Sequence, residues 1–274
     1  MSPDWPLRKQ KEIAVLLNID IGNTTTAFAV CRGLSVIKLH IINNQPGAHV
    51  YRKRVAAALG GIRKRYPLKA IMLCSVVPKL ESGVCSLLKK SFELTPVVVG
   101  RTATVPIVNN YKNRKQVGQD RLVCAYAAKK LYGVPAIIID LGTAITFDVV
   151  TNKGHYDGGM IVPGIKMSTE SLFYKTALLP GIKRIAAPRR LIGKTTEESI
   201  LSGIFYGYGE MCSGLITRIS KKFTNKPKII VTGGHTGLMK KFISRKITAV
   251  EPHLIFKGLT LIYEEVVSKS GNSS

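Results

Sequence analysis

A short motif occurs twice in this chain, and it constrains the fold more than any other feature. The first copy, Asp20-Ile21-Gly22-Asn23, lies between the apolar runs 13–17 and 28–30. The second, Asp140-Leu141-Gly142-Thr143, also lies between two apolar segments. Each copy predicts a strand, a tight turn and a second strand, because glycine allows backbone angles that other residues avoid. Repetition at this separation predicts two similar lobes.

The residues of the first turn indicate a phosphate site with a metal ion. Main-chain N–H groups around Gly22 can donate to an anion, and Asn23 and the following threonine hydroxyls add donors. Asp20 would repel a phosphate unless a cation lay between them, and Mg²⁺ commonly enters nucleotide sites in this way. A single copy would fit an ordinary hairpin equally well. Two copies favour turns that face a shared nucleotide cleft.

Length and composition agree with a two-lobed globular protein. The chain has 274 residues, 45% of them hydrophobic, which is enough for two modest cores. No apolar run approaches the ~20 residues of a membrane span, and residues 1–12 lack the apolar segment of a signal peptide. The five cysteines include no C-x-x-C pair, so reduced thiols are expected and a zinc site is not. We therefore expect a cytoplasmic protein without a membrane partner.

The chain is strongly basic, with 41 Lys and Arg against 16 Asp and Glu and a formal net charge of +25. Such an excess attracts polyanions without sequence preference. A general basic bias of the source proteome, or an adaptation of the cell interior, is the favoured explanation of this charge. The basic residues form only short clusters, and no zinc-finger, recognition-helix or RNP pattern accompanies them. Nucleic acid is therefore a candidate partner but not the expected main one.

Alternating periodicity predicts an α/β architecture in both lobes. The polar basic segment 108–118 and the helix that follows it mark the predicted boundary. The predicted division is an N-terminal extension at 1–12, a first lobe at 13–118, a second lobe at 119–267 and a polar tail at 268–274. Thr195, with Glu198 three residues later, predicts a capping box at the start of a helix that ends near residue 221. Further helices are expected at 48–65, 79–90, 165–178 and 254–267.

Six motifs follow one another along the chain: Asp20-x-Gly22-Asn23-Thr24, Gly118-x-Asp120-Arg121, Asp140-x-Gly142-Thr143-Ala144, Gly158-Gly159-x-Ile161-x-Pro163-Gly164, Gly193-Lys194-x-Thr196-Glu197 and Thr232-Gly233-Gly234. In content and order they resemble the motifs of type III pantothenate kinases, and the similarity extends over residues 13–267. The resemblance implies two duplicated actin/hexokinase-like (ribonuclease H-like) lobes around a nucleotide cleft. It also implies transfer of the γ-phosphoryl group of ATP to pantothenate, which gives 4′-phosphopantothenate, the first step of coenzyme A biosynthesis.

The resemblance implies a role for each matching residue. Asp120 matches the catalytic base, although a helix N-cap is an alternative role compatible with the first. Substrate-binding positions are Tyr111, Gly118, Gln119, Asp120, Arg121 and Thr196. ATP-binding positions are Asp20, Ile21, Gly22, Asn23, Thr24, Thr25, Thr26, Ala27 and Thr143, with Gly233 and Gly234 near the adenosine. Asp140 matches the ligand of a monovalent cation (K⁺ or NH₄⁺), Asp20 is expected at Mg²⁺, and the pantothenate pocket is expected at the interface of a homodimer.

The loop before Gly118 departs from the family pattern. Arg114 and Gln116 stand where the family usually has a proline and an acidic residue. Proline would restrict the backbone, so this loop is expected to be less rigid. Two other functions stay open at this point: a non-catalytic, nucleic-acid-associated accessory factor of transcription from the same family, and a kinase of another small hydroxy acid. The intact Asp20, Asp120, Arg121 and Asp140 favour the pantothenate kinase.

Overall fold

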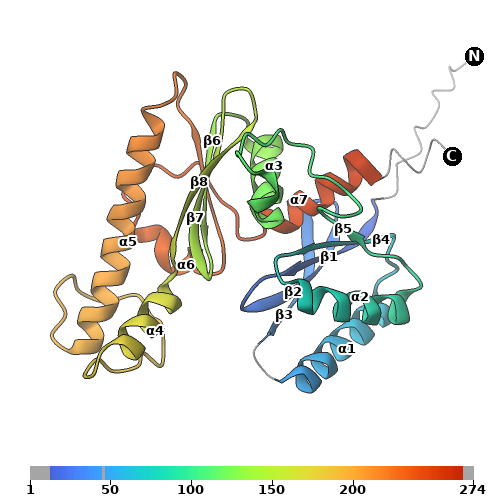
Figure 1. The fold of residues 1–274 in the computed structure, drawn as a ribbon, viewed down its shortest axis with the longest axis horizontal. Helices are drawn as coiled ribbons and strands as arrows, with labels where there is room; N and C mark the ends of the chain where they lie inside the picture. Colours follow the sequence, from blue (N-terminus) through green and yellow to red (C-terminus); the bar gives the residue numbers. More distant parts are fainter. Residues whose placement is uncertain (1–12, 45–46, 268–274) are drawn as a thin grey trace, which may run out of the picture.

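The computed structural model describes residues 13–44 and 47–267, so the predicted extension 1–12 and tail 268–274 lie outside the described residues. The described chain forms two five-stranded sheets (Figure 1). The first has the spatial order β3 (Ser35–Asn43), β2 (Thr25–Arg32), β1 (Val15–Ile21), β4 (Ala70–Ser75), β5 (Val97–Val98). The second has the order β8 (Tyr156–Pro163), β7 (Ala144–Val150), β6 (Ala136–Leu141), β9 (Lys228–Thr232), β10 (Ala249–Val250).

The two sheets have the same topology. In the first, β1 pairs antiparallel with β2 and parallel with β4. In the second, β6 pairs antiparallel with β7 and parallel with β9. The two turns differ in length, since Ile21 pairs with Thr26 whereas Leu141 pairs with Ile145, which makes the first turn one residue longer. The duplicated α/β lobes predicted from the repeated motif are confirmed.

Helices cover the outer face of each sheet. α1 (Ala48–Arg65) and α2 (Pro78–Phe92) pack on the first sheet and bury Val55, Leu59 and Leu88. On the second sheet the outer layer consists of α4 (Ile165–Lys175), α5 (Thr196–Ser220) and α6 (Thr236–Met239). Short helical turns are η1 (Arg114–Gln116), η2 (Lys240–Phe242) and the π-helical η3 (Tyr263–Val267).

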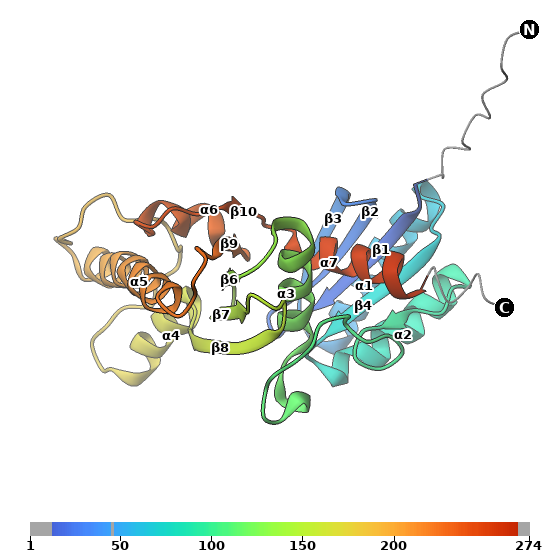
Figure 2. The same cartoon turned by 90° about the horizontal axis from the view of Figure 1, so that it is seen from above.

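Two helices fill the space between the sheets. α3 (Gln119–Tyr132) and α7 (Leu254–Ile262) pack against each other and against the inner faces of both sheets (Figure 2). α7 is tied to the first sheet, because the buried Asn18 donates from Nδ2 to Phe256 O and Thr260 Oγ1, both at 2.8 Å. A segment near the end of the sequence thus completes the core of the first sheet. The division at residue 118 stays a prediction.

At the start of α5, only one of the two hydrogen bonds of the predicted capping box is present. Thr195 Oγ1 accepts a hydrogen bond from Glu198 N at 3.1 Å, as the sequence predicts. The Glu198 carboxylate accepts from Lys194 N at 2.7 Å instead of from the Thr195 N–H of a standard capping box. α4 ends at Lys175, before the predicted end at 178. Among the described residues, no helix is long and apolar enough to cross a membrane.

Candidate active site

Three carboxylates converge where the two sheets meet α3. Asp20 and Asp140 occupy corresponding positions near the carboxyl ends of β1 and β6. Asp20 is paired with Cys74 of β4, which belongs to the cluster that packs on α3 and α7, so both share the inner face of the first sheet. Asp120 is the second residue of α3. The two related strands and the central helix thus direct one carboxylate each towards a common region.

Their electrostatics show that the three carboxylates lie close together. Burial, together with the charges of Asp120 and Asp140, raises the pKa of Asp20 to about 7. Burial also raises the pKa of Asp140 to about 7, with added repulsion from Asp120 and Asp148. Neither Asp20 nor Asp140 takes part in an ion pair within residues 13–44 and 47–267. Carboxylates that raise one another's pKa in this way fit a bound cation.

The donor set fits a cation that a nucleotide helps to hold. No group of three or more His, Cys, Asp or Glu in the described part of the chain is arranged to bind a metal ion by itself. Mg²⁺ usually keeps several waters and binds through one or two carboxylates together with substrate phosphates. Asp20 and Asp140 are each only partly covered, so they can supply such carboxylates.

The turns of the two lobes touch each other. Thr24 Oγ1 and Thr143 Oγ1 are 2.9 Å apart and share a hydrogen bond. Within the turns, Gly22 N donates to Thr25 O at 3.0 Å and Gly142 N donates to Ala144 O at 3.1 Å. Both predicted phosphate turns therefore face the same region.

Not every residue of the predicted ATP loop offers its side chain to this region. Asn23 is exposed and Thr25 is half-buried, whereas the Ile21 side chain lies in the core and Ala27 pairs with Asp20 in the sheet. Thr26 is buried, and its hydroxyl bonds to Asn44 Oδ1 and to Tyr51 OH, both at 2.8 Å.

Asn44 holds the first turn in place, a role that the sequence analysis missed. Its Nδ2 donates to Gly22 O at 2.7 Å, and its main-chain N–H donates to Thr24 O at 2.9 Å. With the bond from Thr26, the turn is attached to the end of β3 and, through Tyr51, to α1. An asparagine just after a strand is common in loops, so the sequence carries no distinctive signal for this contact.

Glycines let Asp120 and its neighbour take their positions. A Cβ atom on Gly118 would lie 2.4 Å from Asp120 Oδ1, so a larger residue there would displace the carboxylate from this position. The same oxygen accepts from Arg121 N at 2.8 Å. The Gln119 side chain packs against Gly100, which has a φ of +85° and where a Cβ would lie 2.7 Å from Gln119 Cδ. Burial raises the pKa of Asp120, while bonds and charge from Arg121 oppose that rise.

Arg121 is held by a buried carboxylate that the sequence analysis did not select. Its Nε donates to Asp148 Oδ1 at 2.8 Å, and its Nη2 lies 2.7 Å from the same oxygen. Tyr156 OH donates to Asp148 Oδ1 at 2.8 Å, and Thr146 Oγ1 donates to Oδ2 at 3.0 Å. Asp148 interrupts the apolar strand β7, and a charge at a buried position needs a partner. That signal could have identified it.

Tyr111 lies in the same group, and Thr196 does not. The Tyr111 ring centroid is 6.5 Å from that of Tyr156, and a Cβ on Gly158 (φ +113°) would lie 3.2 Å from Tyr111 Cε2. Thr196 is exposed at the first residue of α5, which covers the face of the second sheet opposite α3. A single chain therefore does not bring Thr196 to the carboxylate group.

The glycine turn after β9 lies against the second phosphate turn. Gly233 has a φ of +96°, and a Cβ there would lie 2.3 Å from Asp140 Oδ1. His235 N donates to Leu141 O at 2.9 Å. Gly234 has open space at its Cβ position. Gly233 thus packs on Asp140, and Gly234 is the member of the pair that a ligand can approach.

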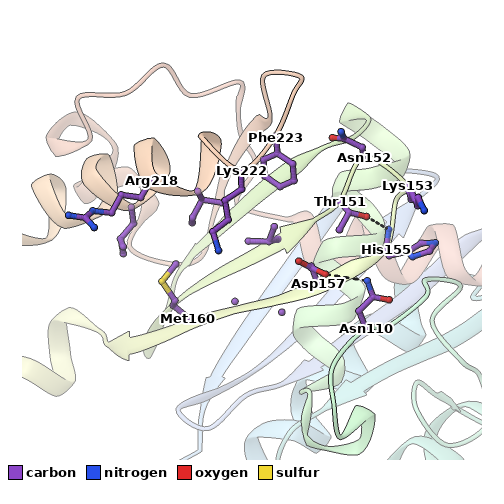
Figure 3. A pocket seen from close by; sticks show the side chains of 15 residues that line it. Asn110, Thr151, Asn152, Lys153, His155, Asp157, Met160, Arg218, Lys222 and Phe223 are labelled. Atoms are coloured by element: carbon purple, nitrogen blue, oxygen red, sulfur yellow. Dashed lines mark hydrogen bonds between the residues drawn. The ribbon is translucent and has the colours of Figure 1, made fainter.

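A cavity of about 830 Å³ lies elsewhere, between the first half of β8 and the end of α5 (Figure 3). Lys222 and Phe223 extend over it from the α5 side, and Asn110 Nδ2 donates to Asp157 at its edge. It contains none of the predicted site residues. The carboxylates and the paired turns instead gather at the N-terminus of α3, so this region is the candidate active site.

Comparison with known proteins decides the family. A family model described as "Type III pantothenate kinase" matches residues 16–218. The chain belongs to the type III pantothenate kinase family. It is 43% identical over 231 residues to a type III pantothenate kinase of Persephonella marina, covering 83% of this chain and 90% of the relative. It is 36% identical over 256 residues to the corresponding protein of Halalkalibacterium halodurans, covering 92% and 100%.

Solved structures agree with this family at the level of the fold. A crystal structure from Campylobacter jejuni, described as a Baf family transcriptional activator, has a TM-score of 0.55 and 20% identity and covers 92% of this chain and 99% of its own. The ethanolamine utilization protein EutJ from Carboxydothermus hydrogenoformans has a TM-score of 0.52 and 14% identity, with coverage of 91% and 88%. At these identities the likeness supports the two-lobed actin/hexokinase-like fold of this pantothenate kinase family and nothing further.

Proposed function

We propose that the chain transfers the γ-phosphoryl group of ATP to the primary hydroxyl of pantothenate, with Asp120 as the base. The family assignment makes the protein an ATP-dependent pantothenate kinase of coenzyme A biosynthesis. The observation that carries the site assignment is the position of Asp120 at the N-terminus of α3, beside Asp20 and Asp140 and near two phosphate turns in contact.

Asp120 suits proton transfer from a hydroxyl group. Phosphoryl transfer depends mainly on positioning and electrostatic stabilisation, and the base removes the hydroxyl proton. Burial raises the pKa of Asp120 above the ordinary carboxyl value, which makes it a stronger base. Arg121 keeps its guanidinium beside Asp148 and close to Tyr111, and it is the cation available for the carboxylate of pantothenate.

We expect Mg²⁺ and the monovalent cation to bind to different carboxylates. Asp20, beside the Gly22 turn, would hold Mg²⁺ together with ATP phosphates, and Asp140 would bind the monovalent cation, K⁺ or NH₄⁺. Bound cations supply positive charge that offsets the charge developing on the transferred group. The raised pKa values of both carboxyls support cation binding, because a nearby cation offsets the burial and the repulsion that raise them.

A second copy of the chain would complete the substrate pocket. Thr196 lies on the far face of its own sheet, so its predicted contact with pantothenate needs a partner subunit. The segment before it exposes large apolar side chains: Ile161 at 63%, Tyr174 at 76%, Leu178 at 92% and Ile192 at 68%. Exposed apolar patches of this kind mark interfaces. We infer a homodimer in which residues 161–196 of one copy face the Asp120 site of the other.

The deciding assay is ATP-dependent phosphorylation of pantothenate with Mg²⁺, first in potassium and then in sodium buffer. Formation of 4′-phosphopantothenate only with potassium would support the substrate and the cation. Asp120→Asn is expected to reduce turnover by at least a hundredfold while ATP binding, measured by calorimetry, is retained. Near-normal turnover by this variant would remove Asp120 as the base. A cytoplasmic location is proposed on the same basis, since the reaction uses ATP.

A further inference from the structure

Helix α1 carries a basic surface that the kinase reaction does not use. Its basic side chains form two triplets, Arg52-Lys53-Arg54 and Arg63-Lys64-Arg65. All six are exposed, and none takes part in an ion pair within the described chain. From Ala48 to Phe92, which includes all of α1 and α2, Glu81 is the single acidic residue, and it pairs with Arg101. Little negative charge therefore offsets this surface locally.

The spacing of the triplets places their corresponding members on the same side of the helix, and each triplet spans about 200° of its outward surface. Equivalent members are eleven residues apart, which at about 100° per residue is close to three full turns and about 16 Å along the axis. Between them the exposed positions are small: Ala56, Ala57 and Gly61. Inward-facing residues Val55, Leu59 and Ile62 anchor the helix to the sheet. The outward face thus has small side chains in the middle and positively charged side chains at both ends.

The helix lies away from the proposed Asp120 site. α1 is on the outer edge of the first lobe, on the side of the sheet opposite α3 and α7 (Figure 1). Lys38 and Arg65 contribute, after burial, to a lowered pKa of the nearby His40, so the positive field extends onto the neighbouring strand β3. A ligand on this face would leave access to Asp120 free.

We propose that the outer face of α1 binds the phosphate backbone of double-stranded nucleic acid. Two triplets about 16 Å apart do not converge on one small anion, but they match phosphates on the two sides of a groove about 12 Å wide. A membrane surface fits less well, because interfacial helices insert large apolar side chains and the positions between the triplets are alanine and glycine. Phosphate contacts of this kind carry no base sequence preference.

The test measures binding of the full-length protein to a fluorescent 20-base-pair DNA duplex across a potassium chloride series. We expect a Kd between about 10⁻⁶ and 10⁻⁴ M near physiological salt. The variant Arg63→Ala/Lys64→Ala/Arg65→Ala should lower the magnitude of the salt slope by about 3, since each lost phosphate contact contributes about 0.9. The matched control Lys221→Ala/Lys222→Ala/Lys226→Ala removes three exposed lysines from the second lobe and should keep the slope.

Equal losses in both variants would overturn the proposal, because the binding would then follow net charge alone. Absence of duplex binding by the natural chain at about 100 mM salt would overturn it as well. Vesicles containing phosphatidylserine form a third arm. If the α1 variant loses vesicle binding but keeps duplex binding, the surface recognises lipid and the proposal is wrong. Kinase activity and thermal unfolding of both variants should match the natural chain, which shows that the fold is intact.

Discussion

Asp148→Asn tests whether the buried Arg121–Asp148 pair holds the site together. The two side chains are 10% and 2% exposed, and Asp148 also accepts from Tyr156 and Thr146. Removing one partner of a buried pair costs about 3–5 kcal/mol, because the other charge stays buried without compensation. Asparagine keeps one acceptor oxygen for Arg121, so we expect a loss of about 3 kcal/mol. At about 2–4 °C per kcal/mol, Tm should fall by about 6–12 °C.

The measurement is thermal unfolding by calorimetry, with Glu81→Gln as the matched control. Glu81 also pairs with an arginine, but the Arg101 side chain is 65% exposed, so its loss should cost at most about 1 kcal/mol. Because Asp148 orients Arg121, KM for pantothenate should also rise in Asp148→Asn, more than KM for ATP. A Tm equal to that of Glu81→Gln would refute the inference that this pair is a buried determinant of stability.

Three further perturbations test other parts of the site. Folding raises the pKa of Asp140 from 3.8 to about 7, so ionisation of this carboxyl makes the fold less stable as pH rises from about 4 to about 7. The variant Asp140→Asn should therefore have a higher Tm than the natural chain at pH 8 in the absence of K⁺, NH₄⁺ and Mg²⁺. A lower Tm would contradict this reasoning. Tyr51→Phe removes one bond to Thr26 and should cost about 1 kcal/mol and raise KM for ATP, whereas Tyr132→Phe, which loses only a bond to Glu251, should leave KM unchanged. Mixing Asp120→Asn with Thr196→Ala chains should restore activity if each site uses residues of both copies, and no gain above the separate variants would place both residues in one chain.

The repeated motif predicted the fold because neighbouring residues are enough to specify a strand, a turn and a second strand. Asp20 to Asn23 and Asp140 to Thr143 each specify a strand, a turn and a strand, and the two sheets repeat one topology around them. Glycine positions such as Gly118 are also visible in the sequence, and the structure shows what fills the space of the missing Cβ. Local signals of this kind predicted the two lobes, whereas the role of Asp120 was predicted from the resemblance of the six motifs to a family.

The contacts that sequence reasoning missed join residues that are far apart in the chain. Asn18 bonds to Phe256 across 238 positions, and Arg121 pairs with Asp148 across 27. Asn44 gives no signal of its own, since its importance depends on the Gly22 turn that it contacts. The position of Thr196 on the far face of its own sheet was not visible either, because a motif reports its order in the sequence and not the face of the sheet on which its helix lies.

The duplication also explains why one carboxylate differs from the other two. Asp20 and Asp140 occupy equivalent places in β1 and β6, so by topology alone they are alternatives for the same task of facing a cation. Asp120 belongs to no strand and lies instead at the N-terminus of α3, the helix that packs between the sheets. The helix N-terminus favours the ionised carboxylate, whereas burial disfavours it. A group under opposed influences of this kind can accept a proton and release it again, as the base proposed for Asp120 has to do.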